Sequence, residues 1–197
     1  MSKARLTIGM LGVLWAAAPA VGQDVGKSEA SVQFFGSFVT SNTVNGVLQT
    51  ATNSGGELAN YRFLFSASTG VEVDYGHTIN TQLYELRTGQ VGVKSSQHEV
   101  SAAFVYRRPL PGMTLWIQAG GGGLIFDSTG LPGAAMQTRL TFVYGLGTDF
   151  SLGKHFFLRL EQRGMLYSSP TFGLTALQGV SRVTNRIEPS VGLGYRF

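Results

Sequence analysis

The sequence predicts an all-β fold: an eight-stranded, up-and-down antiparallel β-barrel whose apolar outer face crosses a membrane. Along several segments, apolar residues alternate with small or polar ones, which is the period of a strand with two unlike faces. Charged residues make up only 13% of the 197-residue chain, and glycine is abundant at 27 residues. Beyond the N-terminal leader, no stretch stays apolar over the about 18 residues that a spanning helix requires.

The leader has the order of a cleaved secretory signal peptide. Lys3 and Arg5 precede an apolar stretch that ends at Ala18 and is too short to span a membrane comfortably. Small residues follow and allow cleavage after Ala20 or Gly22. Loss of the two leader cations lowers the formal net charge from +4 to +2. We therefore expect a signal peptide over residues 1–22 and a barrel domain over residues 23–197.

Eight segments alternate as barrel strands do. The third is clear, because Val71, Val73 and Tyr75 share one face while Glu72 and Asp74 share the other. No segment shows the sustained i, i+3, i+4 apolar spacing of a helix. The expected strands are Ser31–Ser41, Gly56–Phe63, Thr69–Asn80, Gln97–Arg107, Met113–Asp127, Met136–Phe150, His155–Ser168 and Arg186–Phe197.

The joins between these strands are alternately long and short. The long joins are polar and follow the odd strands, at Asn42–Gly55, Thr81–Ser96, Ser128–Ala135 and Ser169–Asn185. The short joins follow the even strands, at Leu64–Ser68, Arg108–Gly112 and Ser151–Lys154. Short periplasmic turns and long outer loops are typical of outer-membrane barrels, so both ends of the barrel domain are expected on the periplasmic side.

Aromatic residues gather near the two expected rims, as the girdles of a membrane barrel do. A soluble β-sandwich or lipocalin is the alternative, and its apolar faces would point inward. Tyr75 and Tyr167 lie toward the long-loop rim. The aromatic residues near the short turns are Tyr106, Trp116, Phe150, Phe156, Phe157, Tyr195 and Phe197.

The barrel domain resembles the small eight-stranded outer-membrane barrels related to the OmpA transmembrane domain and OmpX. The likeness is carried by the final strand Val191-Gly-Leu-Gly-Tyr-Arg-Phe197, by Gly-Val-Glu-Val-Asp-Tyr-Gly at 70–76, and by the loop alternation. It implies a Gram-negative outer-membrane location. It also implies recognition of the C-terminal strand by the barrel-assembly machinery, with Tyr195 and Phe197 as the assembly signal. Pro189 departs from the pattern because it cannot donate to a ladder, and we expect a bulge or the strand's outer rim there.

A set of charged residues falls on the expected inward faces. An eight-stranded barrel is just wide enough for side chains to fill it, so these charges must pair. A structural salt-bridge plug is the favoured interpretation, and a charged constriction in a narrow pore is the alternative. The set is Arg62, Glu72, Asp74, Glu99, Arg107, Arg139, Asp149, Arg159, Glu161, Arg163, Glu188 and Arg196.

No other pattern predicts an active site. His77, His98 and His155 lie on different strands, with no ligand spacing and no evident Ser or Asp constellation nearby, so we expect neither a metal nor a catalytic role. The glycine run 120–123 lacks a following Gly-Lys-Ser/Thr and indicates a bend or a close backbone approach. The absence of cysteine excludes disulfides and thiolate chemistry.

The second and fourth long joins carry apolar residues, which favour strand extension beyond the bilayer and leave partner contact open. They are Leu83, Tyr84, Leu86, Val91 and Val93 in the second join, and Phe172, Leu174, Leu177 and Val180 in the fourth.

Taken together, these patterns predict a monomeric integral outer-membrane protein with a structural or surface-interaction role. Its expected partners are outer-membrane lipid and the assembly machinery. The chain has no concentrated run of Lys or Arg, so nucleic acid is not an expected partner. We expect no enzyme activity, cofactor or metal, while a narrow pore and a lipid-modifying enzyme are the alternative functions.

Overall fold

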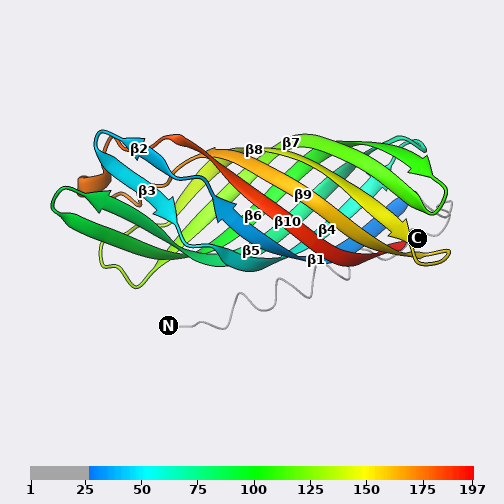
Figure 1. Cartoon of the computed structure of the whole chain (residues 1–197), viewed down its shortest axis with the longest axis horizontal. Coiled ribbons are helices and arrows are strands. Elements are labelled where there is room, and N and C mark those ends of the chain that lie inside the picture. Colours follow the sequence, from blue (N-terminus) through cyan, green and yellow to red (C-terminus); the bar gives the residue numbers. More distant parts are fainter. Residues whose placement is uncertain (1–26) are drawn as a thin grey trace.

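The computed structural model describes residues 27–197, which form one closed antiparallel barrel (Figure 1). The expected signal peptide therefore lies outside the described residues. The predicted number and order of the wall strands are confirmed. The wall consists of β1 (Ser28–Val39), β4 (Ser54–Leu64), β5 (Thr69–Leu86), β6 (Gly89–Leu110), β7 (Met113–Thr129), β8 (Gln137–Ser151), β9 (Phe156–Ser168) and β10 (Val183–Arg196).

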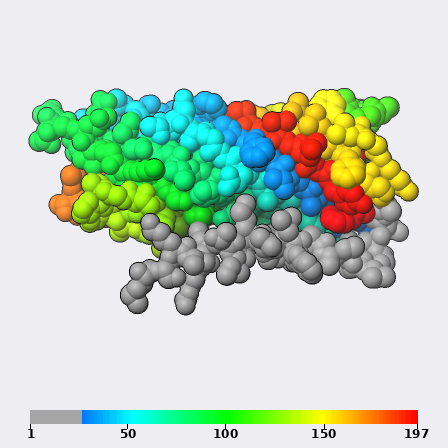
Figure 2. Space-filling model, turned by 90° about the horizontal axis from the view of Figure 1, so that it is seen from below, coloured from blue at the N-terminus to red at the C-terminus, as the bar shows by residue number. Residues whose placement is uncertain are grey.

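The barrel closes between its first and last strands. Each wall strand pairs with its neighbours in sequence, and β1 pairs antiparallel with β10 from Glu29 opposite Arg196 to Val39 opposite Arg186. Figure 2 shows these two strands, blue and red, winding side by side across one face. Closure leaves the wall without a free edge, so its backbone groups are paired within the protein.

The two ends of the barrel differ in their connections. At the end we call the turn end, strands are joined by residues 65–68, 111–112 and 152–155, and both Ser28 and the C-terminus lie there. This agrees with the predicted short joins. The opposite end, the loop end, carries the longer connections and extends well beyond the wall (Figure 1).

Two of the long joins contain more strand than the sequence suggested. The first holds a small hairpin of β2 (Asn42–Val44) and β3 (Val47–Ala51), with β3 pairing onto β5. The second is not a loop: β5 and β6 pair without interruption up to Leu86 opposite Gly89, so only two residues turn the chain. The strand extension favoured for this apolar join is therefore confirmed.

The fourth join, by contrast, is not extended strand. It includes a short 3-10 helix, η1 (Thr175–Leu177), and folds back so that Phe172, Leu177 and Val180 are buried. The prediction of strand extension was wrong here, because these apolar residues lack the period of two that holds the second join in a sheet. Within residues 27–197, no helix has the length and apolar character needed to cross a membrane.

The outer wall is apolar and the interior is largely polar. Leu140 is 86% exposed and Phe34 is 71% exposed, whereas the alternate residues of the same strands are mostly covered. Three predicted girdle aromatics were misplaced, since Trp116, Phe157 and Tyr167 are buried inside the barrel. Each of the three is an even number of residues from inward-facing polar or charged residues on its own strand. The alternation of side chains along a strand therefore decides which way they point, even near a rim.

Pro189 lies in the middle of β10, with neither the bulge nor the rim position that we expected. Its register with β9 is continuous, with Pro189 opposite Gln162. On the other side the β1–β10 ladder has a gap between Phe35 opposite Ser190 and Phe38 opposite Ile187, although the register is the same on both sides. Since proline has no N–H to donate, it interrupts the pairing without shifting it.

The glycine run brings β6 and β7 together. A Cβ on Gly120 would lie 2.1 Å from the carbonyl oxygen of Ala102, and one on Gly122 would lie 2.3 Å from that of Val100. No side chain fits at either position, so the predicted close backbone approach is confirmed.

Candidate functional site

The inward face of β9 runs the length of the interior and contributes one side chain at each level. From the turn end upward it presents Arg159, Glu161, Arg163, Met165 and Tyr167, all 5% exposed or less. The interior thus changes along its axis from charged to apolar. Two ion-pair clusters fill the part nearer the turn end, and an apolar cluster closes the loop end.

The turn-end cluster surrounds Arg159, whose guanidinium makes a two-point contact with Asp149. Nε donates to Oδ1 at 2.7 Å and Nη2 donates to Oδ2 at 2.9 Å, while Nη1 donates to Glu72 Oε2 at 2.9 Å. Arg62 donates from Nε to the same Glu72 oxygen at 2.9 Å. Forked contacts of this kind are among the strong hydrogen bonds of proteins, because both groups are ionised and the geometry matches. The cluster comprises Glu29, Arg62, Glu72, Asp149 and Arg159.

Trp116 packs within this cluster. The Arg62 guanidinium carbon lies 4.4 Å from the indole centroid, and that of Arg159 lies 5.0 Å away. The indole Nε1 donates to Asp149 Oδ1 at 3.2 Å. Trp116 therefore makes cation–π contacts with two arginines and donates a hydrogen bond to Asp149, which explains why an aromatic residue predicted for the rim faces inward.

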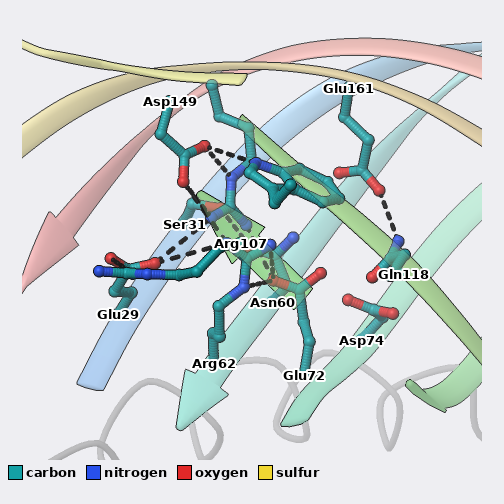
Figure 3. Close-up of polar contacts among 12 residues, drawn as sticks. Glu29, Ser31, Asn60, Arg62, Glu72, Asp74, Arg107, Gln118, Asp149 and Glu161 are labelled. Carbon is teal, nitrogen blue, oxygen red and sulfur yellow. Dashed lines mark hydrogen bonds and ion pairs between the residues drawn. The ribbon is translucent and has the colours of Figure 1, made fainter. Parts of the chain in front are cut away.

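A layer of amides separates the turn-end cluster from the next charges. Glu161 accepts from Gln33 Nε2 at 2.9 Å and from Gln118 Nε2 at 2.8 Å. Within the described part of the chain no arginine lies at ion-pair distance from this carboxyl, although Arg159 and Arg163 flank it on β9. Figure 3 shows the Glu161–Gln118 contact set apart from the arginine contacts.

The second group of charges, the central cluster, consists of Asp74, Glu99, Arg163, Arg186 and Glu188. Arg163 Nη2 lies 2.8 Å from Glu188 Oε2, and Arg186 Nη2 lies 2.7 Å from Glu188 Oε1. Both arginines also contact Glu99, and Asp74 accepts from Ser101 Oγ at 2.9 Å. No member of this cluster is more than 2% exposed.

Above the central cluster an apolar cluster lies beside the buried amides of Asn80, Gln82 and Gln97. Phe126 packs against Tyr167 with centroids 5.7 Å apart and meets Phe172 edge-on at 6.3 Å. The fourth loop is fixed from the wall, since Gln137 Oε1 accepts from the backbone N–H groups of Thr171 and Phe172. We call this cluster the apolar cap; it contains Val47, Tyr84, Val93, Leu124, Phe126, Val143, Met165, Tyr167, Phe172, Leu177 and Val180.

The predicted charged residues do not all join the two clusters. Arg107 and Arg196 lie at the turn-end rim, where Arg107 Nη1 and Arg196 Nε donate to Glu29 Oε1 at 2.8 and 3.0 Å. Arg139 lies beside the apolar cap and donates only to Gln137 Oε1, at 3.1 Å. Sequence reasoning missed Glu29 and Arg186 because both fell just outside or at the limit of an expected strand, although their parity along β1 and β10 would have placed them inside.

The proposed assembly residues form an aromatic group on the outer wall at the turn end. Tyr195 stacks on His155 with centroids 5.4 Å apart and meets Phe156 and Phe197 edge-on at 5.1 and 5.2 Å. The backbone N–H of Phe197 donates to the carbonyl of Ser28 at 2.9 Å, so the last residue is tied to the first strand.

Two of the three histidines lie on different strands, as predicted, but strand register brings them together. His77 and His98 are directly opposite each other on β5 and β6, with ring centroids 4.9 Å apart on the outer wall. Ser96 and Glu57 lie within hydrogen-bond distance of His77. This group has no signature in the sequence, because its members come from three strands and meet only through strand register. Among residues 27–197, no group of three or more His, Asp or Glu side chains is arranged to hold a metal ion.

Comparison with solved structures identifies the architecture. The outer membrane protein OprG from Pseudomonas aeruginosa matches with a TM-score of 0.63 at 15% identity, covering 89% of this chain and 98% of that one. Neisserial surface protein A (NspA) matches with a TM-score of 0.66 at 11% identity, covering 89% and 100%. Ail, the attachment invasion locus protein of Yersinia pestis, gives 0.53 at 21% identity, covering 87% and 99%.

No family model matches the chain, and no curated protein sequence matches it either. The structural likeness therefore establishes the fold. The chain has the fold of the small eight-stranded outer-membrane β-barrels, as the sequence predicted.

Proposed function

We propose that this chain is an integral outer-membrane protein, with its turn end in the periplasm and its loop end outside the cell. The observation that carries the proposal is the inversion of the wall: large apolar side chains are exposed outside, while arginines and carboxylates are buried inside. A water-soluble protein rarely exposes such a continuous apolar surface, whereas a bilayer requires one. The fold shared with OprG and NspA supports the same location.

Two leucines of the β8–β9 hairpin provide a matched test. Leu146 on the outer wall and Leu152 in the turn are equally exposed, at 59% and 58%. In a bilayer, Leu146→Arg is expected to lower the free energy of unfolding by about 2–4 kcal/mol, since a cation then faces lipid. Leu152→Arg lies beyond the wall and is expected to change it by less than about 0.5 kcal/mol. Equal effects in urea titrations of vesicle-inserted protein would contradict a membrane-spanning wall.

We propose further that the barrel is sealed and serves a structural or surface-interaction role. The turn-end cluster, the central cluster and the apolar cap support this proposal, because the side chains of all three are buried. A narrow pore is the competing function. Recordings from the purified protein in planar bilayers are expected to show no reproducible conductance step, and a steady step would favour the pore.

Surface interaction would fall to the loop end, where β2, β3 and the β5–β6 hairpin extend beyond the wall (Figure 1). The turn end has a different role in this proposal. Tyr195 and Phe197 present exposed and half-buried rings on the final strand, which suits recognition by the assembly machinery. Deleting Phe197 is expected to reduce the amount of heat-modifiable, folded protein in outer membranes while leaving refolding in detergent nearly unchanged.

A further inference from the structure

A polar group of five side chains lies on the mostly apolar outer wall, across three neighbouring strands. Glu57 of β4 is opposite His77 of β5, and His77 is opposite His98 of β6. Ser96 lies two residues from His98 on the same face of β6, and Tyr75 lies two residues from His77 on β5. Neither Glu57, at 42% side-chain exposure, nor His77, at 26%, is buried. The group is therefore accessible from outside the barrel.

Hydrogen bonds join these five side chains in one line. His77 Nδ1 lies 3.1 Å from Glu57 Oε1, and His77 Nε2 lies 2.9 Å from Ser96 Oγ. Ser96 Oγ lies 3.5 Å from His98 Nε2, whose Nδ1 lies 2.9 Å from the Tyr75 hydroxyl.

The direction of these bonds follows from Glu57. An ionised carboxylate only accepts, so His77 Nδ1 donates to it and His77 Nε2 is left as an acceptor for the Ser96 hydroxyl. Ser96 Oγ then accepts from His98 Nε2–H, and His98 Nδ1 accepts from Tyr75. Each proton has one donor and one acceptor along the line, and the basic nitrogen of His77 faces the serine oxygen.

We propose that Ser96, His77 and Glu57 form a serine-hydrolase triad on the outer wall, acting on acyl esters of membrane lipids. A nucleophile bonded to a base, with the base held by a third group, is the arrangement that activates serine in unrelated folds. Ser96 and His77 are the catalytic residues, and Glu57 is a positioning residue that fixes the His77 tautomer. No spacing in the sequence predicts this triad, because its three residues come from three strands and meet only through strand register.

The surroundings indicate the substrate class. Ser96 is opposite Ile79, which is 48% exposed; Val100, two residues from His98, is 50% exposed; and Phe34 stands opposite Glu57. These side chains belong to the apolar wall, so the choice of a lipid substrate rests on the membrane insertion proposed above. An acyl chain lying along this wall would bring its ester carbonyl to Ser96 without leaving the bilayer surface.

The chemistry balances with water as the only co-reactant. Ser96 Oγ attacks the ester carbonyl as its proton passes to His77 Nε2, and the tetrahedral intermediate places its oxyanion near His98 Nε2–H. The intermediate collapses by breaking the bond to the alcohol oxygen, which takes the proton from His77 and leaves an acyl-Ser96. Water, deprotonated by His77, then attacks the acyl group; the fatty acid departs and Ser96 recovers its proton.

The first experiment labels the nucleophile. Folded protein in detergent micelles is treated with a long-chain alkyl fluorophosphonate, and the adduct is located by peptide mass spectrometry. Ser96 is expected to be labelled, and Ser96→Ala to abolish labelling. Ser168→Ala, which removes a half-buried serine of β9 that makes no contact with a histidine, is the matched control and should label fully. Heat-modifiable migration on gels checks that each variant is folded.

The second experiment measures fatty acid release from two kinds of vesicle, one of phosphatidylethanolamine and one containing lipopolysaccharide, which separates the two sources of acyl ester. His77→Gln is expected to lower the rate at least about a hundredfold, the lower end of what a general base contributes. Glu57→Gln is expected to lower kcat about tenfold or more at unchanged KM, with partial recovery in Glu57→Asp, as for loss of a positioning group that biases the tautomer.

The proposal stands if Ser96 is labelled and fatty acid is released from at least one kind of vesicle in a Ser96-dependent manner. It is overturned if folded protein leaves Ser96 unlabelled, or if neither vesicle releases fatty acid. Labelling in micelles does not depend on the bilayer. Failure of the triad is therefore distinguishable from failure of membrane insertion, which the two leucine variants test.

Discussion

The two halves of the barrel interior are lined by the same strands yet are held by different forces. Along β9, Arg159 and Arg163 serve the charged half, whereas Met165 and Tyr167 serve the apolar cap. In the charged half only the wall can supply side chains, and arginine is long enough to reach across and bind carboxylates from opposite strands. At the loop end the chain itself folds in, so Phe172, Leu177 and Val180 supply the packing. The way a barrel is filled thus depends on whether a loop can enter it.

The largest expected effect comes from breaking the charged half. Asp149 and Glu72 share two cations, Arg159 and Arg62, and Arg159→Met removes the one that makes the two-point contact with Asp149 while both carboxylates stay buried. Loss of one partner of a buried ion pair is expected to lower the free energy of unfolding by about 3–5 kcal/mol. Urea titration of vesicle-inserted protein, followed by heat-modifiable gel migration, measures it. A loss below about 1 kcal/mol would show that Arg62 or water compensates the two carboxylates, and that Arg159 does not hold this half together.

The apolar half should respond locally instead. Phe172 has a positive φ of 53°, a strained backbone that persists because its ring is held in the cap. Phe172→Ala is expected to remove about 3 kcal/mol of packing, near the low end for a buried phenylalanine, and to release the fourth loop before the wall. Limited proteolysis within residues 169–182 should then accelerate about a hundredfold, since about 1.4 kcal/mol corresponds to a factor of ten. Unchanged cleavage, with a lower urea midpoint for the whole barrel, would show that cap and wall unfold together.

The two halves should also differ in additivity. Arg163 and Glu188 are opposite each other on β9 and β10 and pair at 2.8 Å. Replacing both by Met is expected to cost about 1–3 kcal/mol less than the sum of the single replacements, because each single variant strands a charge. For Val47→Ala with Phe172→Ala in the cap, no charge is stranded, and the same cycle in urea should give a smaller coupling energy. Equal coupling energies in both halves would remove the distinction between electrostatic and packing control.

The sequence predicted the wall better than its contents. Period-two alternation and join lengths identified eight strands, and parity placed Arg62, Glu72 and Arg159 inside. Glu29 and Arg186 were missed because the expected strand limits excluded the first and began at the second, although alternation places both inside. Parity also does not predict which residues on neighbouring strands meet. The Glu57–His77–Ser96 line depends on the register between strands, and neither strand's own pattern fixes that register. The inward fold of the fourth loop had no periodic signal at all.

The smallest expected effect uses the same substitution as the largest. Arg139 was predicted for the charge network, but it lies beside the apolar cap, and within residues 27–197 no carboxylate lies at ion-pair distance from it. Arg139→Met strands no acid and replaces a half-buried cation by an apolar chain of similar length. We expect a change within about 0.5 kcal/mol in the urea titration used for Arg159→Met, or a slight stabilisation. Both variants lose the same atoms, so the difference between them separates the effect of losing carboxylate partners from the effect of losing the arginine side chain's volume. If Arg139→Met were as damaging as Arg159→Met, the length of the arginine chain, rather than its ion pairs, would be what fills the barrel.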